Sequence, residues 1–177
     1  MKTTVLRAFS VVGFFCAAPL SFSAVPSKAV QSSCLVGEAT STAVNVVELA
    51  RNLISEQENY ADGYDAVYYF LDGKTEIGYG EKSGKGGVIY AGKIYPIEHA
   101  KVISMPHSKP SEFSPALASW NRVRDASGAY LCVNFNFDGI GRSGSFQNFK
   151  GGYLLRIGRG RDKLYYIEGN VGAIRRQ

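Results

Sequence analysis

Residue types that commonly form catalytic or metal sites are scarce in this chain. It has two histidines and three cysteines among 177 residues. It contains no C-x-x-C or H-x-x-x-H pair, so the ligand spacing of a zinc site is missing. The G-x-S-x-G pattern of many serine hydrolases is missing as well. The sequence therefore points to no metal site of these types, and we expect no cofactor.

Long apolar runs are also lacking, apart from one near the N-terminus. Lys2 and Arg7 precede the run VVGFFCAAPL, and the small-residue stretch SFSA follows it. A positive region, an apolar region and a small-residue exit are the parts of a secretory signal. The run is about half of the roughly 20 residues that a membrane-spanning helix needs. We predict a signal peptide over residues 1–23, no transmembrane segment, and a soluble exported protein that is periplasmic or secreted.

Cleavage of this signal would leave two cysteines, Cys34 and Cys132. An even pair in a protein sent to an oxidising compartment predicts a disulfide. A loop of about 100 residues closed in this way stabilises a protein by about 4 to 5 kcal/mol on the chain-entropy model. The alternative is a catalytic thiol, which needs a nearby histidine, and the chain offers only His99 and His107.

The remaining residues, about 150 in number, suit one domain. We interpret residues 24–36 as a leader segment and 37–177 as a single domain. Within 45–57, NVVELARNLISEQ, apolar residues recur at helical spacing, and Asn45 with Glu48 resembles a capping box. This pattern predicts the one long helix of the chain, with these residues facing the core: Val46, Val47, Ala50, Leu53 and Ile54.

After this segment the apolar period changes to two, which is typical of strands. Asp72-Gly73 is the strongest hairpin signal, and Gly92-Lys93 and residues 125–128 indicate two further turns. In AYLCVNFNF the apolar residues alternate with Tyr130, Cys132, Asn134 and Asn136, and we expect the two asparagines to face solvent, although they could instead line a cleft. The predicted fold is α+β: one N-terminal helix on a curved antiparallel sheet of about six to eight strands. The alternative is a β-barrel or sandwich closed by the helix.

A glycine motif, G-x-G-x-x-G, occurs in FDGIGRSGSF. A dinucleotide site needs a helix directly after these glycines, because the helix N-terminus holds the pyrophosphate. The following residues, SFQNFKGGYLLRI, have the spacing of a strand. We therefore interpret the motif as a hairpin loop and expect no nucleotide. The loop is instead the candidate binding site, with Arg142 as its anion-binding residue beside Gly139, Gly141, Ser143 and Gly144.

Charge is distributed unevenly along the chain. Residues 24–112 carry eight basic and eleven acidic side chains, whereas residues 113–177 carry ten and four. A basic half favours a partner with an acidic surface. The alternative is that these basic residues are solvated strand ends and turns.

Two functions remain. The first is an exported binding module that recognises another macromolecule, which we expect to be a protein, as an inhibitor, immunity factor or accessory subunit does. The eleven tyrosines favour it if they lie at an interface, although they could simply fill the faces of strands. The second is a small ribonuclease-like hydrolase, in which His107 and Glu112 would exchange protons and Arg122 would hold a phosphate.

Overall fold

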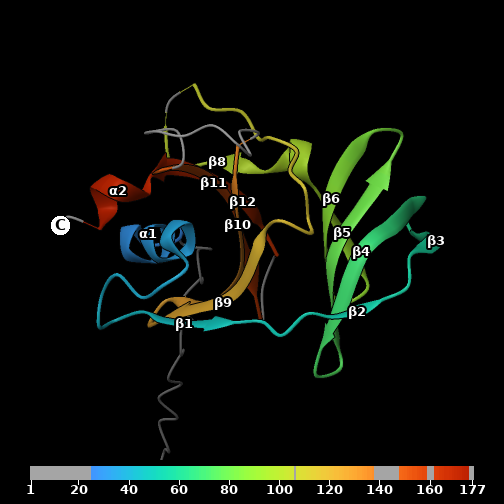
Figure 1. Cartoon of the computed structure of the whole chain (residues 1–177), viewed down its shortest axis with the longest axis horizontal. Helices are drawn as coiled ribbons and strands as arrows, with labels where there is room; N and C mark the ends of the chain where they lie inside the picture. Colours follow the sequence, from blue (N-terminus) through green and yellow to red (C-terminus); the bar gives the residue numbers. More distant parts are fainter. Residues whose placement is uncertain (1–24, 106, 138–147, 159–161, 176–177) are drawn as a thin grey trace, which may run out of the picture.

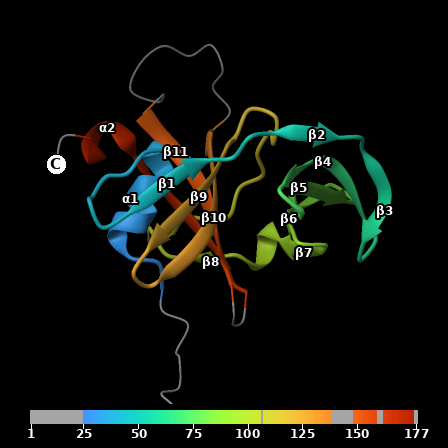
Figure 2. The ribbon, with the colours of Figure 1, turned by 90° about the horizontal axis from the view of Figure 1, so that it is seen from below.

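The computed structural model describes residues 25–105, 107–137, 148–158 and 162–175. These residues form three layers, with two helices on one side, a first sheet in the middle and a second sheet on the other side (Figure 1). The view turned by 90° shows the same order (Figure 2). Within the described ranges, no helix is long and apolar enough to cross a membrane. The predicted signal peptide lies outside these ranges.

The middle layer, sheet A, has the strand order β1-β9-β10-β11-β12-β8. Its neighbours pair antiparallel, except β12 and β8, which are parallel. In chain order its strands are β1 (Asn45–Glu48), β8 (Lys101–Val102), β9 (Ser119–Asp125), β10 (Gly128–Asn136), β11 (Phe149–Ile157) and β12 (Leu164–Asn170).

The outer layer, sheet B, has the order β2-β4-β5-β6-β7, and β3 also pairs with β4. All of its pairs are antiparallel. Its strands are β2 (Asn52–Ile54), β3 (Gln57–Ala61), β4 (Tyr64–Asp72), β5 (Thr75–Lys82), β6 (Lys85–Tyr90) and β7 (Lys93–Pro96). A short 3-10 helix, η1 (Ile97–His99), leads from sheet B back to sheet A.

The two sheets face one another across a core that is rich in aromatic side chains. Trp120 of β9 is 1% exposed. Its ring packs against Tyr68 and Phe70 of β4 and against Phe113 of the connection before β9. Large rings from both layers therefore fill this core.

The opposite face of sheet A is covered by helix α1 (Lys28–Val36) and the short helix α2 (Val171–Ile174). The Ser27 side chain caps the start of α1 by accepting a hydrogen bond from the Val30 N–H at 3.2 Å. Gly37, with φ of 82°, ends the helix in the left-handed conformation that favours glycine. Cys34 in this helix is bonded to Cys132 of β10, with 5.7 Å between the Cα atoms. The predicted disulfide is confirmed, and it ties α1 to the centre of sheet A.

The position predicted for the helix is wrong. Residues 45–57 form β1, β2 and the start of β3, and the helix lies in the segment interpreted as a leader. Asn45 and Glu48 are not a capping box, since they pair with Arg124 and Asn121 of β9. In the predicted stripe Val46 is half-buried and the other four residues are exposed, while the neighbouring Leu49 is buried. Pairing with β9 and β4 overrides the helical spacing of these apolar residues.

The strand predictions agree better with the structure. Hairpins turn at Gly73, Gly92 and residues 125–128, as predicted. Along β10, Leu131, Val133 and Phe135 face sheet B, while Tyr130 and Cys132 face α1. Asn136 is exposed, but the expectation for Asn134 is wrong, because that side chain is 2% exposed beneath the end of α1.

The general class of a helix on antiparallel sheet is correct, but two sheets form where one was expected. In the described chain neither sheet closes into a barrel. The two facing layers resemble the sandwich alternative, although α1 covers a sheet face and not an end.

Candidate functional site

The predicted binding loop lies outside the described residues, together with Gly139, Gly141, Arg142, Ser143 and Gly144. The strands on either side of it, β10 and β11, pair antiparallel from Asn136 with Lys150 onward. A strand therefore follows the glycine motif, as the sequence predicted, and the segment joins two neighbouring strands. A role for Arg142 in binding stays a prediction.

The structure does not join the three residues of the hydrolase hypothesis into one group. His107 is an exposed residue of the connection after β8. Glu112 accepts hydrogen bonds from the Gly86 N–H and from the Tyr79 hydroxyl. Arg122 forms an ion pair with Asp72 that joins β9 to β4. Within the described part of the chain, no hydrogen bond or ion pair links these three residues to each other.

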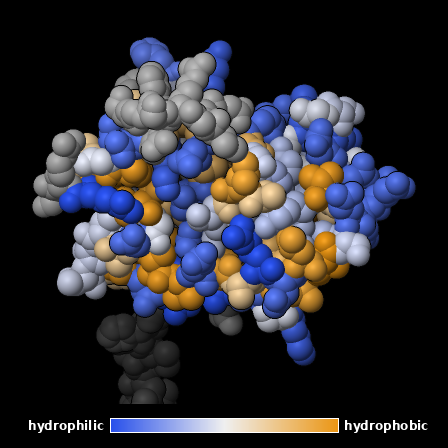
Figure 3. Space-filling model, in the orientation of Figure 1, coloured by the Kyte–Doolittle hydropathy of each residue, from blue (hydrophilic) through white to orange (hydrophobic). Residues whose placement is uncertain are grey.

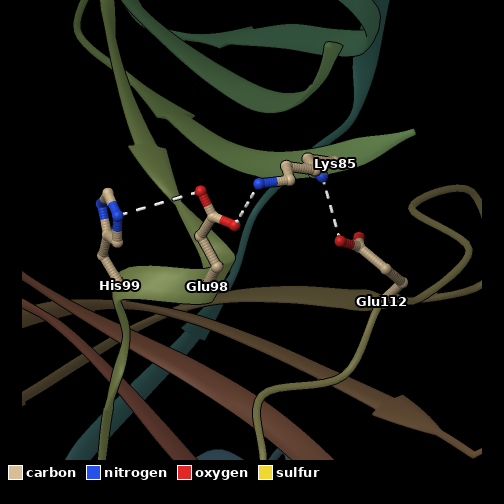
Figure 4. Close-up of polar contacts among 5 residues, drawn as sticks. Lys85, Glu98, His99 and Glu112 are labelled. Carbon is tan, nitrogen blue, oxygen red and sulfur yellow. Dashed lines mark hydrogen bonds and ion pairs between the residues drawn. The ribbon is translucent and has the colours of Figure 1, made fainter. Parts of the chain in front are cut away.

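A polar cluster lies where β6, η1 and the connection before β9 approach one another (Figure 4). Lys85 Nζ lies 2.8 Å from Glu98 Oε2, and His99 Nε2 lies 3.8 Å from Glu98 Oε1. The hydrogen bond between Lys85 and Glu98 raises the pKa of the lysine and lowers the pKa of the carboxyl group. The His99 side chain is 75% exposed. A general base is normally oriented by a hydrogen bond and shielded from water, and His99 has neither feature among the described residues.

Glu112, at the other end of Figure 4, has a structural role. Its Oε1 accepts the hydrogen bond of the Gly86 N–H at 3.0 Å. A Cβ atom at Gly86 would overlap the Tyr79 hydroxyl and the Glu112 carboxylate, so a larger residue here would displace these two side chains. Beside it Phe113 stacks on Phe135, with 4.8 Å between ring centroids. Glu112 therefore anchors the connection between β8 and β9 to sheet B, and Phe113 anchors it to sheet A.

The tyrosines do not form an exposed contact surface. All eleven lie in the described residues, and each is buried or half-buried. Four hydroxyls donate to carboxylates, in the pairs Tyr60–Glu76, Tyr79–Glu112, Tyr95–Asp162 and Tyr166–Glu168. Burial, and then the neighbouring carboxylate, raises the pKa of each of these four phenols. The interpretation that tyrosines fill strand faces is correct.

Apolar side chains are exposed on the segment that passes from sheet A to sheet B. β1 pairs only with β9, and β2 pairs only with β4, so among described residues each strand has one unpaired edge. Both views show the two strands running on from one another (Figures 1 and 2). Val47 is 50% exposed and Leu53 is 61% exposed. Ile54 and Leu71, on β2 and its neighbour β4, are exposed as well.

Figure 3 shows this apolar surface at the end of sheet B where β2 meets β4, with hydrophilic side chains around it. We call the unpaired side of β2, with the side chains of Leu53, Ile54 and Leu71, the β2 edge. These positions are visibly apolar in the sequence, but the helical spacing predicted that Leu53 and Ile54 face the core. Only the pairing with β4 reveals that they lie at an edge.

Comparisons with protein-family models, with curated proteins and with solved structures found no match to this chain.

Proposed function

We propose that the protein is an exported binding module that recognises another protein through the β2 edge. One observation carries this proposal: a strand with a single neighbour presents apolar side chains to solvent. Natural proteins protect such edges with lysine, proline, bulges or a covering segment, because an exposed edge pairs readily with another chain. Leu53 and Ile54 lie on a strand that contains neither lysine nor proline.

The partners of the charged residues support binding over hydrolysis. In the hydrolase hypothesis Glu112 exchanges protons, but its carboxylate already holds Gly86 and Tyr79. Arg122 would have to leave Asp72 to hold a phosphate. Both residues thus stabilise the contact between the sheets and the connection that covers it.

Export is the second part of the proposal. Residues 1–23 have the pattern of a secretory signal, and the mature chain keeps a disulfide between Cys34 and Cys132. Disulfides persist mainly in oxidising compartments, such as the periplasm and the extracellular medium.

A capture experiment tests the proposal with the mature, oxidised protein as bait in an extract of the native envelope or medium. Wild type should retain one protein in stoichiometric amount, and the variant Leu53→Lys should lose it. Met105→Lys is the matched control, because Met105 is also an exposed apolar residue but follows β8 at the far edge of sheet A. Equal retention by Leu53→Lys and wild type would remove the β2 edge from the site.

A further inference from the structure

The backbone of β2 is available to a further strand. Asn52, Leu53 and Ile54 are directly opposite Leu71, Phe70 and Tyr69 of β4. In the described chain no other strand pairs with β2, so the N–H and C=O groups on its second side have no ladder partner. Each of the three residues is exposed. A chain lying alongside could therefore extend sheet B by main-chain hydrogen bonds.

The side chains of the β2 edge offer apolar contact on both faces of sheet B. Leu53 lies opposite Phe70, on the face that is turned toward sheet A. Ile54 and Leu71 lie on the other face, since side chains alternate along a strand and opposite residues share a face. In an added strand, the residues on one face would cover Leu53, and the residues on the other face would lie beside Ile54.

The charge beside the β2 edge is mainly negative, because Arg51, just before β2, donates hydrogen bonds to the carbonyl oxygens of Ala116 and Ala118. Residues 52–72 contain five acidic side chains and neither lysine nor arginine. Asp72 is paired with Arg122, and Asp65 accepts a hydrogen bond from the Asn59 N–H. Glu56 and Glu58 follow β2 directly, are exposed, and have carboxylates that no hydrogen bond or ion pair engages among the described residues. They leave negative charge beside an apolar edge.

We propose that the β2 edge binds an extended partner segment in which lysine or arginine alternates with apolar residues, and that this segment adds to sheet B as a strand. The inference rests on the proposed function and names the chemistry of the partner. Main-chain pairing positions the segment, its apolar residues cover Leu53 on one face of sheet B, and its lysine or arginine side chains, on the other face, reach toward Glu56 and Glu58. A second copy of this chain fits less well, because two β2 edges would bring the same carboxylates together.

The probe is a capped eight-residue peptide of alternating lysine and valine, added to the mature, oxidised, isotope-labelled protein. We expect backbone amide shifts confined to residues 45–61 and 69–72, and an affinity that falls as salt is added. Leu53→Lys and the double variant Glu56→Gln with Glu58→Gln should each weaken binding at least tenfold. Met105→Lys should bind as wild type does.

Two control peptides separate strand addition from simple charge attraction. One keeps the lysines and valines but carries N-methyl groups on alternate amides, which removes the donors that β2 would use. The other replaces lysine by glutamate. Both should bind at least tenfold more weakly than the first peptide. Equal binding of the N-methylated peptide would overturn strand addition, and equal binding of the glutamate peptide would overturn the cationic partner.

Two further results would overturn the inference. The first is that no peptide binds while Leu53→Lys still loses the captured protein, which leaves the proposed function standing but not the partner chemistry. The second is a dimer of the free protein that Leu53→Lys abolishes, which assigns the β2 edge to a second copy.

Discussion

Sheet A and sheet B are built from similar short strands, but their surroundings differ. Sheet A is covered on both faces, by α1 on one and by sheet B on the other. On the face of sheet B away from sheet A, the described residues form a small buried cluster of Ala66, Tyr69 and Ile89, partly covered by Tyr60 of β3. Because burial is the main source of stability, sheet A should hold the fold together. Sheet B has the exposed β2 edge, at which we propose that a partner binds.

Loss of the disulfide should have the largest effect, because it frees α1 from sheet A. The bond joins residues separated by 98 positions. On the chain-entropy model its removal costs about 4 to 5 kcal/mol. Urea unfolding of the double variant Cys34→Ala with Cys132→Ala measures this loss. An unchanged midpoint would mean that α1 contributes little to the stability of sheet A.

The contact between the sheets is the next test. Trp120→Ala should cost about 3 to 5 kcal/mol, because the ring is buried against Tyr68, Phe70 and Phe113. Urea unfolding should show this loss in a single transition. If sheet B unfolds separately at low urea in the wild type, the two sheets do not share one core as described.

Alkaline pH should weaken both sheets through their buried tyrosines. The pKa values of Tyr60, Tyr79, Tyr95, Tyr153 and Tyr166 are raised in the folded protein, chiefly by burial. A raised pKa means that the folded state holds the proton more tightly than the unfolded state. Its contribution to stability is present below the ordinary tyrosine pKa of about 10 and is lost as the pH rises above it.

Absorbance at 295 nm, followed together with circular dichroism, measures this effect. These five phenols should ionise only as the protein unfolds. Ionisation near pH 10 with the fold intact would contradict their burial and their hydrogen bonds.

The smallest expected effect compares a leucine of each sheet. Leu53→Ala on β2 should change the free energy of unfolding by about 0.5 kcal/mol or less, because the side chain is 61% exposed. Leu131→Ala on β10 should cost about 2 to 5 kcal/mol, because that side chain is 2% exposed. Similar losses in the two variants would show that the β2 edge is covered in solution.

The sequence predicted best what depends on neighbouring residues. The turn at Gly73 and the alternation from Leu131 to Phe135 follow from local backbone preference and from one buried face. The pairing of Cys34 with Cys132 followed from counting cysteines after the signal. Helix α1 has sequence signals at both ends, the N-cap Ser27 and the C-cap Gly37. Its nine residues are too few to give a clear helical period. The surrounding polar and proline-containing residues favoured the interpretation as a leader segment.

The β2 edge could not be predicted, because exposure depends on which strands lie alongside. Val47 and Leu53 have the same spacing whether they face a core or solvent, so the apolar stripe was assigned to a buried helix. Their exposure follows from strand pairing. β1 pairs with β9, which is distant in the sequence, and β2 pairs with β4, from which it is separated by β3. The acidic stretch over residues 52–72 is a local signal in the sequence, but it does not stand out when charge is counted over all of residues 24–112.

Hydrogen exchange of the mature, oxidised protein, alone and with the captured partner, tests the binding site most directly. In the free protein, residues 45–56 should exchange much faster than the amides of β10 and β11, which have strands on both sides. Addition of the partner should slow exchange mainly within residues 45–61. Slower exchange confined to α1 or to sheet A, with residues 45–61 unchanged, would contradict recognition at the β2 edge.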